Sequence, residues 1–395
     1  MDEISYHTFY IPTKTIYKVL DQEYKMYRNK KEWLITMLVL ISLLFSLFTI
    51  YVYSENSPSI SARSAALYEP ETKSFVYTKN PHERLGMAST TKIMSALIAL
   101  ENVSLDTQIK VDDRAIGTDG SSIYLEQGEI LSAEDLLYAL MLSSANDAAE
   151  ALAYEICGSI EGFCDMMNDR AEELGLKDTR FSNPHGLDAK EHYTSAYDLA
   201  IISAEALKNP KFKEIVSTKR REIGSNSKTR VLVNHNKLLK QYDGCIGVKT
   251  GYTKATGRSL VGAAEKDGVC LISVTIDAPN DWSDHKKLLD FGFSTVHSLS
   301  LIEAGEFNYS LPVVNGEVNS INVKNKDKLN YIYTNNTPEI TKEIRLQRFA
   351  VAPIKRGDIV GSIEFKCDGK IIATTDIIAS ESVEETKTKL FNRLF

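Results

Sequence analysis

The sequence predicts an α+β fold with a largely antiparallel sheet, followed by a smaller β-rich region. Segments with helical periodicity and strand-like segments are mixed before residue 300 rather than alternating regularly, which argues against a parallel sheet. After about residue 300, only strand-like runs occur, and the dipeptides Asn315-Gly316 and Asp368-Gly369 are typical of hairpin turns. We therefore expect one domain at 64–300, a β-rich domain at 301–378 and a tail at 379–395.

The N-terminal region contains one long apolar segment. Residues Trp33 to Tyr53 are 21 residues without a charge, and a helix of that length spans about 31 Å, the thickness of a bilayer core. Basic residues precede the segment, so residues 1–32 are predicted to be cytoplasmic and the chain beyond residue 53 to lie outside the cell membrane. The segment at 33–53 is either a retained anchor or the core of a cleaved signal peptide, and a linker follows at 54–63.

The first 25 residues do not fit this arrangement. Residues 26–32 already form the short basic region that usually precedes an apolar export segment. Gln22-Glu23 can be encoded CAG GAG, which contains the ribosome-binding sequence AGGAG. We hypothesise that translation starts at Met26 and that Met1 is a misassigned start. Codons reading CAA GAA would remove the main support for this hypothesis.

The elements of the first domain follow from periodicity. Two β-prone runs, Ser64–Tyr68 and Ser74–Tyr77, flank a turn-forming segment and predict a hairpin. From Ser89 onward, apolar residues recur at three- and four-residue spacing, which predicts a helix. Further helices are predicted at Ala133–Leu142, Asp147–Ile156 and Ile160–Leu174, and strands at Val231–Val233, Gly247–Thr250, Ser259–Ala264 and Val269–Asp277.

Composition excludes several classes of function. The 46 basic and 53 acidic residues give a net charge of −7, so no basic surface for a nucleic-acid partner is indicated. The five cysteines form no C-x-x-C pair, which argues against a disulfide framework and a zinc site. We expect the cysteines to be reduced and buried.

The motif Ser-x-x-Lys occurs three times, as Ser89/Lys92, Ser225/Lys228 and Ser283/Lys286. Only the first copy opens an apolar helix, where both side chains share a face and the first-turn N–H groups point at whatever the serine attacks. Taken alone, the motif favours an ordinary helix cap at Ser89, and Lys92 would then be a surface lysine.

Two further motifs follow in the chain. Ser144-Ala145-Asn146 lies between two helical stretches and could be a simple cap, and Lys249-Thr250-Gly251 could be a charged strand edge. In this order, separated by 55 and then 105 residues, the three motifs form the set found in penicillin-recognising serine enzymes.

On these motifs the chain resembles the low-molecular-mass penicillin-binding proteins that act as serine D-alanyl-D-alanine carboxypeptidases. The resemblance covers roughly residues 62–378 and includes the segments 64–70, 87–94, 183–188, 194–200 and 247–253. It implies a β-lactamase-like catalytic domain, in which an antiparallel sheet lies between helix clusters, followed by a small β-rich domain. It implies no metal and no other cofactor. The expected partners are stem peptides of peptidoglycan that end in D-Ala-D-Ala, β-lactam antibiotics as inhibitors, and the membrane.

The chemistry of acyl transfer accounts for the first motif. A serine hydroxyl is a poor nucleophile until a base removes its proton, and Lys92 can be that base if burial and a neighbouring cation lower its pKa. We expect Lys249 to be that cation.

The resemblance assigns the other residues. Ser144 would relay a proton to the departing D-alanine, and Asn146 would hold the substrate's peptide amide. Lys249 and Thr250 would bind the terminal carboxylate. The backbone N–H groups of Ser89 and Tyr252, which follows Gly251, would stabilise the oxyanion.

Three alternatives remain at this stage. A class A β-lactamase carries a glutamate about 36 residues after the Ser-x-Asn serine, where this chain has Arg180. A non-catalytic wall-binding protein could keep the fold without the chemistry. A metal peptidase would use residues such as His185, Asp188, His192 and His235, although the chain contains no H-E-x-x-H motif. The tail, with apolar residues among lysines and arginine, is either a short amphipathic helix on a membrane or a plain terminus.

Overall fold

The computed structural model describes residues 57–226, 228–334 and 337–386, together with eight separate residues of the N-terminal region. The chain divides into two units, Met1–Pro58 and Ser59–Phe395. The apolar segment at 33–53 lies almost wholly outside the described residues, and the start-site hypothesis also concerns this region. Among the residues that are described, no helix combines the length and the apolar character needed to cross a membrane.

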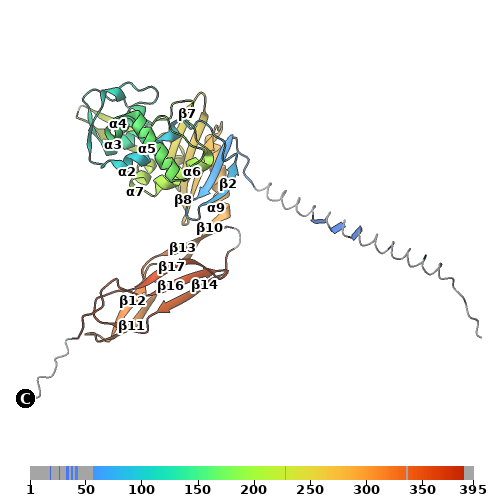
Figure 1. Cartoon of the computed structure of the whole chain (residues 1–395), viewed down its shortest axis with the longest axis vertical. Helices are drawn as coiled ribbons and strands as arrows, with labels where there is room; N and C mark the ends of the chain where they lie inside the picture. The colour runs from blue at the N-terminus through green and yellow to red at the C-terminus, as the bar shows by residue number, and fades with distance from the viewer. Residues whose placement is uncertain are drawn as a thin grey trace, which may run out of the picture. The chain divides into compact units, whose positions relative to one another are not determined.

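A five-stranded antiparallel sheet forms the centre of the first domain (Figure 1). Its strands lie in the order β2 (Ser74–Lys79), β1 (Ser64–Glu69), β9 (Val269–Ile276), β8 (Gly257–Lys266) and β7 (Cys245–Thr253). Successive strand residues point to opposite faces. On β1, Ala66 and Tyr68 pack into the large core on one face, whereas Ala65 and Leu67 pack into a smaller core on the other. Because both faces are covered, β1 is buried along its whole length.

Helices cover both faces of this sheet. The helix α9 (Asp281–Thr295) covers the face with the smaller core through Leu288 and Leu289. The other helices are α2 (Lys92–Asn102), α3 (Ala133–Leu142), α4 (Asn146–Cys157), α5 (Ile160–Glu173), α6 (Ala196–Leu207), α7 (Pro210–Ser217) and α8 (Leu238–Gln241). Helix α2 packs among α3, α4, α5 and α6, and α6 packs on β1 and β9. The prediction of an antiparallel sheet between helix clusters is therefore confirmed.

Two small hairpins complete the first domain. The sequence predicted only part of one of their strands. They are β3 (Gln108–Lys110) with β4 (Ile130–Ser132), and β5 (Arg220–Gly224) with β6 (Thr229–Val233). The sequence predicted the last part of β6, the hairpin of β1 and β2, and the helices α2 to α5. It did not predict the helices α6 to α9.

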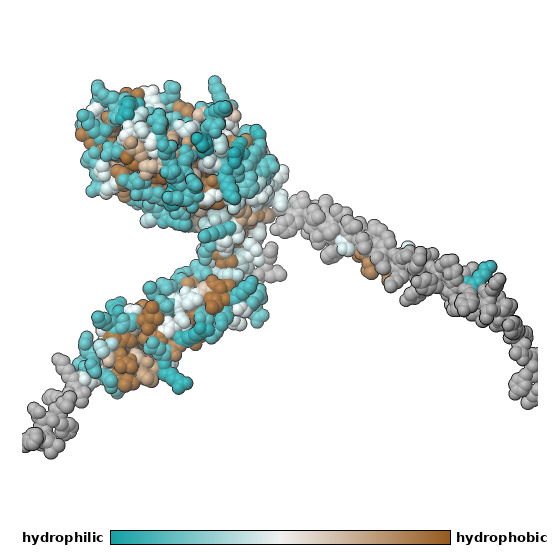
Figure 2. Space-filling model, viewed as in Figure 1, coloured by the Kyte–Doolittle hydropathy of each residue, from teal (hydrophilic) through white to brown (hydrophobic). Residues whose placement is uncertain are grey.

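In its described residues, the C-terminal domain contains strands and no helix. They are β10 (Val296–Ile302), β11 (Asn308–Val314), β12 (Ser320–Asn325), β13 (Leu329–Thr334), β14 (Ile340–Leu346), β15 (Ala350–Val351), β16 (Ile359–Cys367) and β17 (Lys370–Ala379). The hairpins predicted at Asn315-Gly316 and Asp368-Gly369 join β11 to β12 and β16 to β17. Figure 2 shows apolar residues on the visible face of this domain, and the neighbours Val314 and Val351 are both exposed. Most of the predicted tail, residues 387–395, lies outside the described residues.

The cysteines are free, as expected, but most of them are not fully buried. Only Cys164 is buried, and the other four are half-buried. Burial raises the pKa of the Cys164 thiol to about 12, which leaves it a protonated and unreactive side chain.

Candidate active site

Ser89 lies in the 3₁₀ turn η1 (Ala88–Thr91), directly before α2. The turn begins in a left-handed conformation, with a φ of 47° at Ala88 that alanine rarely adopts. Thr91 holds this turn because its Oγ1 donates to the carbonyl of Ala88 at 2.8 Å. The Ser182 N–H donates to Nδ1 of His192 at 3.1 Å, so Nε2 carries the proton and donates to Thr91 Oγ1 at 2.8 Å. Burial lowers the pKa of His192 to about 4, which keeps this arrangement neutral.

Lys92, one turn later, is completely buried and its Nζ contacts three oxygen atoms. Nζ lies 2.6 Å from Oδ1 of Asn146, 2.5 Å from the carbonyl of His185 and 3.1 Å from Oγ of Ser89. Burial lowers the pKa of Lys92 well below its usual value, and the charge of Lys249 lowers it further. A neutral amine has two hydrogens and one lone pair. The amide and peptide oxygens can only accept, so in the neutral amine they can take both hydrogens, which would leave the lone pair for the Ser89 hydroxyl.

Asn146 is oriented by a second contact on its other side. Its Nδ2 donates to the carbonyl of Asp119 at 2.6 Å, so Oδ1 must face Lys92. The next residue, Asp147, is fully buried, and its carboxylate accepts from Ser122 Oγ at 2.5 Å and from the Leu125 N–H at 3.0 Å. The loop before β4 is thereby fixed to the start of α4.

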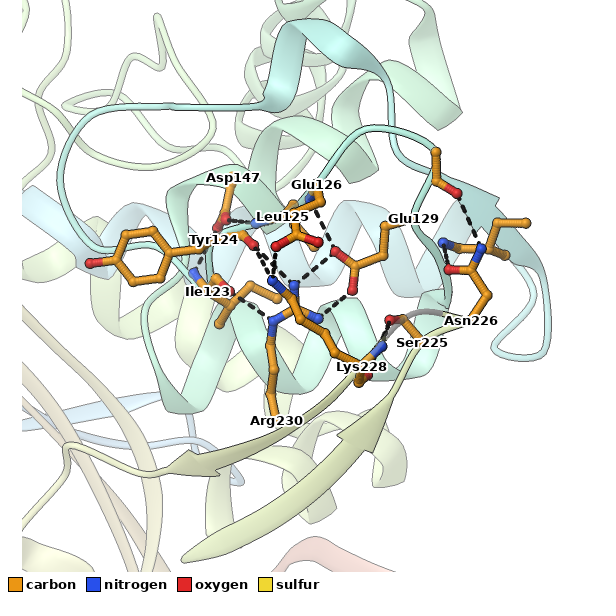
Figure 3. A network of polar contacts seen from close by, with 12 residues as sticks. Ile123, Tyr124, Leu125, Glu126, Glu129, Asp147, Ser225, Asn226, Lys228 and Arg230 are labelled. Carbon is orange, nitrogen blue, oxygen red and sulfur yellow. Dashed lines mark hydrogen bonds and ion pairs between the residues drawn. The ribbon is translucent and has the colours of Figure 1, made fainter.

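A network of polar contacts attaches the same loop to the β5–β6 hairpin (Figure 3). Arg230 of β6 pairs with the buried Glu129 and donates to the carbonyl of Tyr124 at 3.0 Å. Lys228 donates to the same carbonyl at 3.2 Å. Although burial opposes it, hydrogen bonding from Arg230 lowers the pKa of Glu129 to about 2. The contact between Arg230 and the buried Glu129 is charge-assisted, and it holds in place the loop next to Asn146.

Ser144 lies at the joint between α3 and α4 in a left-handed conformation, with a φ of 59°. It is buried, and the N-cap position of α4 belongs to Ala145. Thr91 likewise occupies the N-cap position of α2, in place of Ser89. The simpler explanations of these serines as helix caps are therefore wrong.

The strand β7 brings the third motif to the same place. Lys249 is only 1% exposed, so it is not a charged strand edge, and burial lowers its pKa to about 7. Its Nζ donates to the carbonyl of Thr250 at 2.9 Å. A Cβ on Gly251 would lie 3.0 Å from the backbone nitrogen of Ser89, which shows how closely β7 lies against η1. Tyr252 follows on β7 and is 64% exposed.

Residues 183–188 contribute a contact that sequence reasoning missed. The segment entered the sequence analysis only as part of the family resemblance, yet the His185 carbonyl is one of the three oxygens around Lys92. Gly186 has a φ of 94°, and a Cβ there would lie 1.9 Å from the carbonyl of Ala88, so only glycine fits. Asn183 Oδ1 accepts from the Gly186 N–H at 2.7 Å. A sequence motif identifies side chains, whereas this contact is made by a backbone carbonyl. The sequence therefore carried no direct signal for it.

Two of the three histidines named for the metal alternative have other side-chain or backbone partners. His192 bonds Thr91 and Ser182, and His185 Nε2 lies 3.3 Å from Glu150 Oε1. In the described part of the chain, no cluster of three or more His, Cys, Asp or Glu side chains has an arrangement that could hold a metal ion.

Taken together, a serine directly before α2, a buried lysine 3.1 Å from its hydroxyl and a second buried lysine on the adjoining strand β7 form the arrangement typical of a serine acyl-transfer enzyme of the penicillin-recognising class. A family model described as D-alanyl-D-alanine carboxypeptidase matches residues 51–280, and one described as penicillin-binding protein 5, C-terminal domain, matches residues 297–385. The chain therefore belongs to the D-alanyl-D-alanine carboxypeptidase family and is a serine-type D-Ala-D-Ala carboxypeptidase.

Similar proteins agree with this assignment. The chain is 33% identical over 335 residues to the D-alanyl-D-alanine carboxypeptidase DacF of Bacillus subtilis, covering 82% of this chain and 86% of the relative. It is 31% identical over 357 residues to DacC of Escherichia coli, covering 83% and 86%. The crystal structure of penicillin-binding protein 5 from Haemophilus influenzae matches with a TM-score of 0.60 at 28% identity, covering 83% of this chain and 99% of that one. The predicted family and fold class are confirmed.

Proposed function

We propose that Ser89 forms the acyl-enzyme and that Lys92 is its base. The observation that carries this proposal is the position of Lys92 Nζ, 3.1 Å from Ser89 Oγ and within hydrogen-bond distance of two acceptor oxygens, of Asn146 and His185, which can take the hydrogens of a neutral amine. Lys92 accepts the hydroxyl proton as Ser89 Oγ bonds to the carbonyl carbon between the two D-alanines. The backbone N–H groups of Ser89 and Tyr252 bind the oxyanion.

Collapse of the tetrahedral intermediate completes the transfer. The C–N bond breaks, and the proton held by Lys92 passes to the departing amine through Ser144, the serine of the motif that contains Asn146. Asn146 holds the substrate amide, and Lys249 with Thr250 binds the carboxylate of the leaving D-alanine. Water then hydrolyses the ester on Ser89 and releases the shortened peptide.

The same geometry supports acylation of Ser89 by β-lactams. A β-lactam presents a reactive carbonyl and a carboxylate in the places of the scissile carbonyl and the terminal carboxylate. At the position where class A β-lactamases carry the deacylating glutamate, this chain has Arg180, an exposed side chain 3.9 Å from Glu191. An arginine is always protonated and cannot activate water. The adduct should therefore be long-lived.

We also propose that the enzyme works on the outer side of the cell membrane. This rests on the uncharged segment at 33–53 and the basic residues before it. The substrate, a component of the cell wall, lies on that side. Protease added to intact protoplasts should digest the catalytic domain, and protection of the domain would contradict this placement.

The test of the proposed activity is release of free D-alanine from diacetyl-L-Lys-D-Ala-D-Ala. We expect the purified protein to release one equivalent of D-alanine, and to leave unchanged a peptide that ends in L-Ala-L-Ala. A non-catalytic wall-binding protein would release none from either peptide. Rapid turnover of benzylpenicillin with no release of D-alanine would favour the β-lactamase alternative.

A further inference from the structure

A cavity of about 380 Å³ lies beside the residues already described but includes none of the three motifs. Its walls include Gly86, three residues before Ser89, and Ala255 and Thr256, which follow β7 directly. Asp188 also lines it, and its Oδ1 accepts from the hydroxyls of Thr253 and Thr256 at 2.9 and 3.0 Å. The cavity therefore lies next to the C-terminal end of β7, beyond Tyr252.

The direction of the bound substrate decides what this cavity can hold. In the proposed function, on which this inference rests, Lys249 and Thr250 bind the leaving D-alanine, and Tyr252 binds the oxyanion. The rest of the peptide must then run from Tyr252 toward Thr256. β7 ends at Thr253, and residues 254–256 form the turn into β8, so the cavity lies past the end of the strand. The part of the peptide that reaches the cavity therefore lies upstream of the D-alanine that is acylated.

Two positions upstream of that D-alanine, a peptidoglycan stem peptide carries D-isoglutamate, which is linked through its side chain and so keeps a free α-carboxylate. The cavity wall offers a cation for it. Arg63 donates to Glu83, and Arg84 donates to Asp178. Lys190, by contrast, is exposed and lines the cavity, and it pairs with no side chain in the part of the chain that the structure describes. Tyr193 supplies an aromatic wall beside it.

We propose that this cavity is a subsite for the upstream half of the stem peptide, in which Lys190 binds the free α-carboxylate of D-isoglutamate. The two aspartates that line the cavity do not neutralise the charge of Lys190, because each already has other partners. Asp188 already accepts two hydroxyl hydrogen bonds, and Asp277 lies near the guanidinium of Arg63 and contributes to raising its pKa.

The experiment compares three substrates in the full-length protein. They are diacetyl-L-Lys-D-Ala-D-Ala, which ends before the subsite, the pentapeptide L-Ala-γ-D-Glu-L-Lys-D-Ala-D-Ala, and the same pentapeptide with the α-carboxylate amidated. We expect Lys190→Glu to raise KM for the free-acid pentapeptide by roughly tenfold, and Lys190→Gln by about threefold, with kcat unchanged. KM for the other two substrates should change by less than about twofold. Lys110→Glu, at an exposed lysine of β3, is the control and should change none of them.

Equal changes on all three substrates, or no change on any, would overturn the subsite. The subsite would also be overturned if a gain in affinity required an attached disaccharide rather than the peptide carboxylate. Cleavage of the short peptide by the wild type tests the proposed function separately. A protein that cleaves the short peptide but shows no dependence on Lys190 keeps its function and loses only this subsite.

Discussion

Lys92→Ala is expected to slow acylation by benzylpenicillin by roughly 10²- to 10⁴-fold, the usual contribution of a general base. The reason is the position of Nζ, 3.1 Å from Ser89 Oγ and within hydrogen-bond distance of Asn146 Oδ1 and the His185 carbonyl. The measurement is the second-order rate constant for acylation, obtained with a fluorescent penicillin. Because the active form of Lys92 is neutral, the wild-type rate should also fall as pH is lowered through the depressed pKa of this lysine.

A matched control is available in the third Ser-x-x-Lys motif. Lys286→Ala removes a lysine three residues after Ser283 on α9, away from η1, and should leave acylation unchanged. Thermal unfolding of both variants separates loss of the base from loss of the fold. An acylation rate near that of the wild type in folded Lys92→Ala would show that another group removes the serine proton.

Lys249→Gln is expected to reduce acylation roughly ten- to a hundredfold, because a charge-assisted hydrogen bond to the substrate carboxylate is worth about 1.5–3 kcal/mol. The pH dependence gives a sharper signature. Lys249 must be protonated to bind the carboxylate, and burial lowers its pKa to about 7. The value of kcat/KM for the free-acid peptide should therefore fall as pH rises above about 7 in the wild type, and Lys249→Gln should lack this decline.

An amidated peptide tests whether the carboxylate is the partner. A peptide that ends in D-Ala-D-alaninamide already lacks the contact, so Lys249→Gln should affect it much less than the free acid. Equal losses on both peptides would mean that Lys249 acts on the pKa of Lys92 or on the fold. The role in binding the carboxylate would then be withdrawn.

The sequence predicted those elements whose periodicity reflects burial on one face or between two layers. Helix α3 begins and ends where its apolar pattern does, at Ala133 and Leu142. Helix α9 was missed because Pro279 and Asn280 precede it like a loop, and its residues include exposed charges among the apolar positions that pack on the sheet. Helix α6 follows a capping serine, Ser195, whose Oγ accepts from the Asp198 N–H at 3.1 Å. That capping signal could have found it.

The motif residues of the site were named from sequence, but the contacts that set their chemistry were not. The alternatives of a surface lysine and a charged strand edge failed because the fold buries Lys92 and Lys249 completely. Burial of a lysine is decided by segments far away in the chain, so a local pattern cannot show it. The same holds for His192, whose bond to Thr91 joins residues 101 positions apart, and for the carbonyl of His185.

The measurement that tests the central claim most directly is peptide mapping of the protein after reaction with penicillin. We expect a single stable adduct on Ser89, and no adduct in Ser89→Ala, because Ser89 lies 3.1 Å from a completely buried lysine whose pKa is lowered well below its usual value. Modification of Ser225 or Ser283, the serines of the other Ser-x-x-Lys motifs, would contradict the assignment of the nucleophile and with it the roles proposed for Lys92 and Lys249.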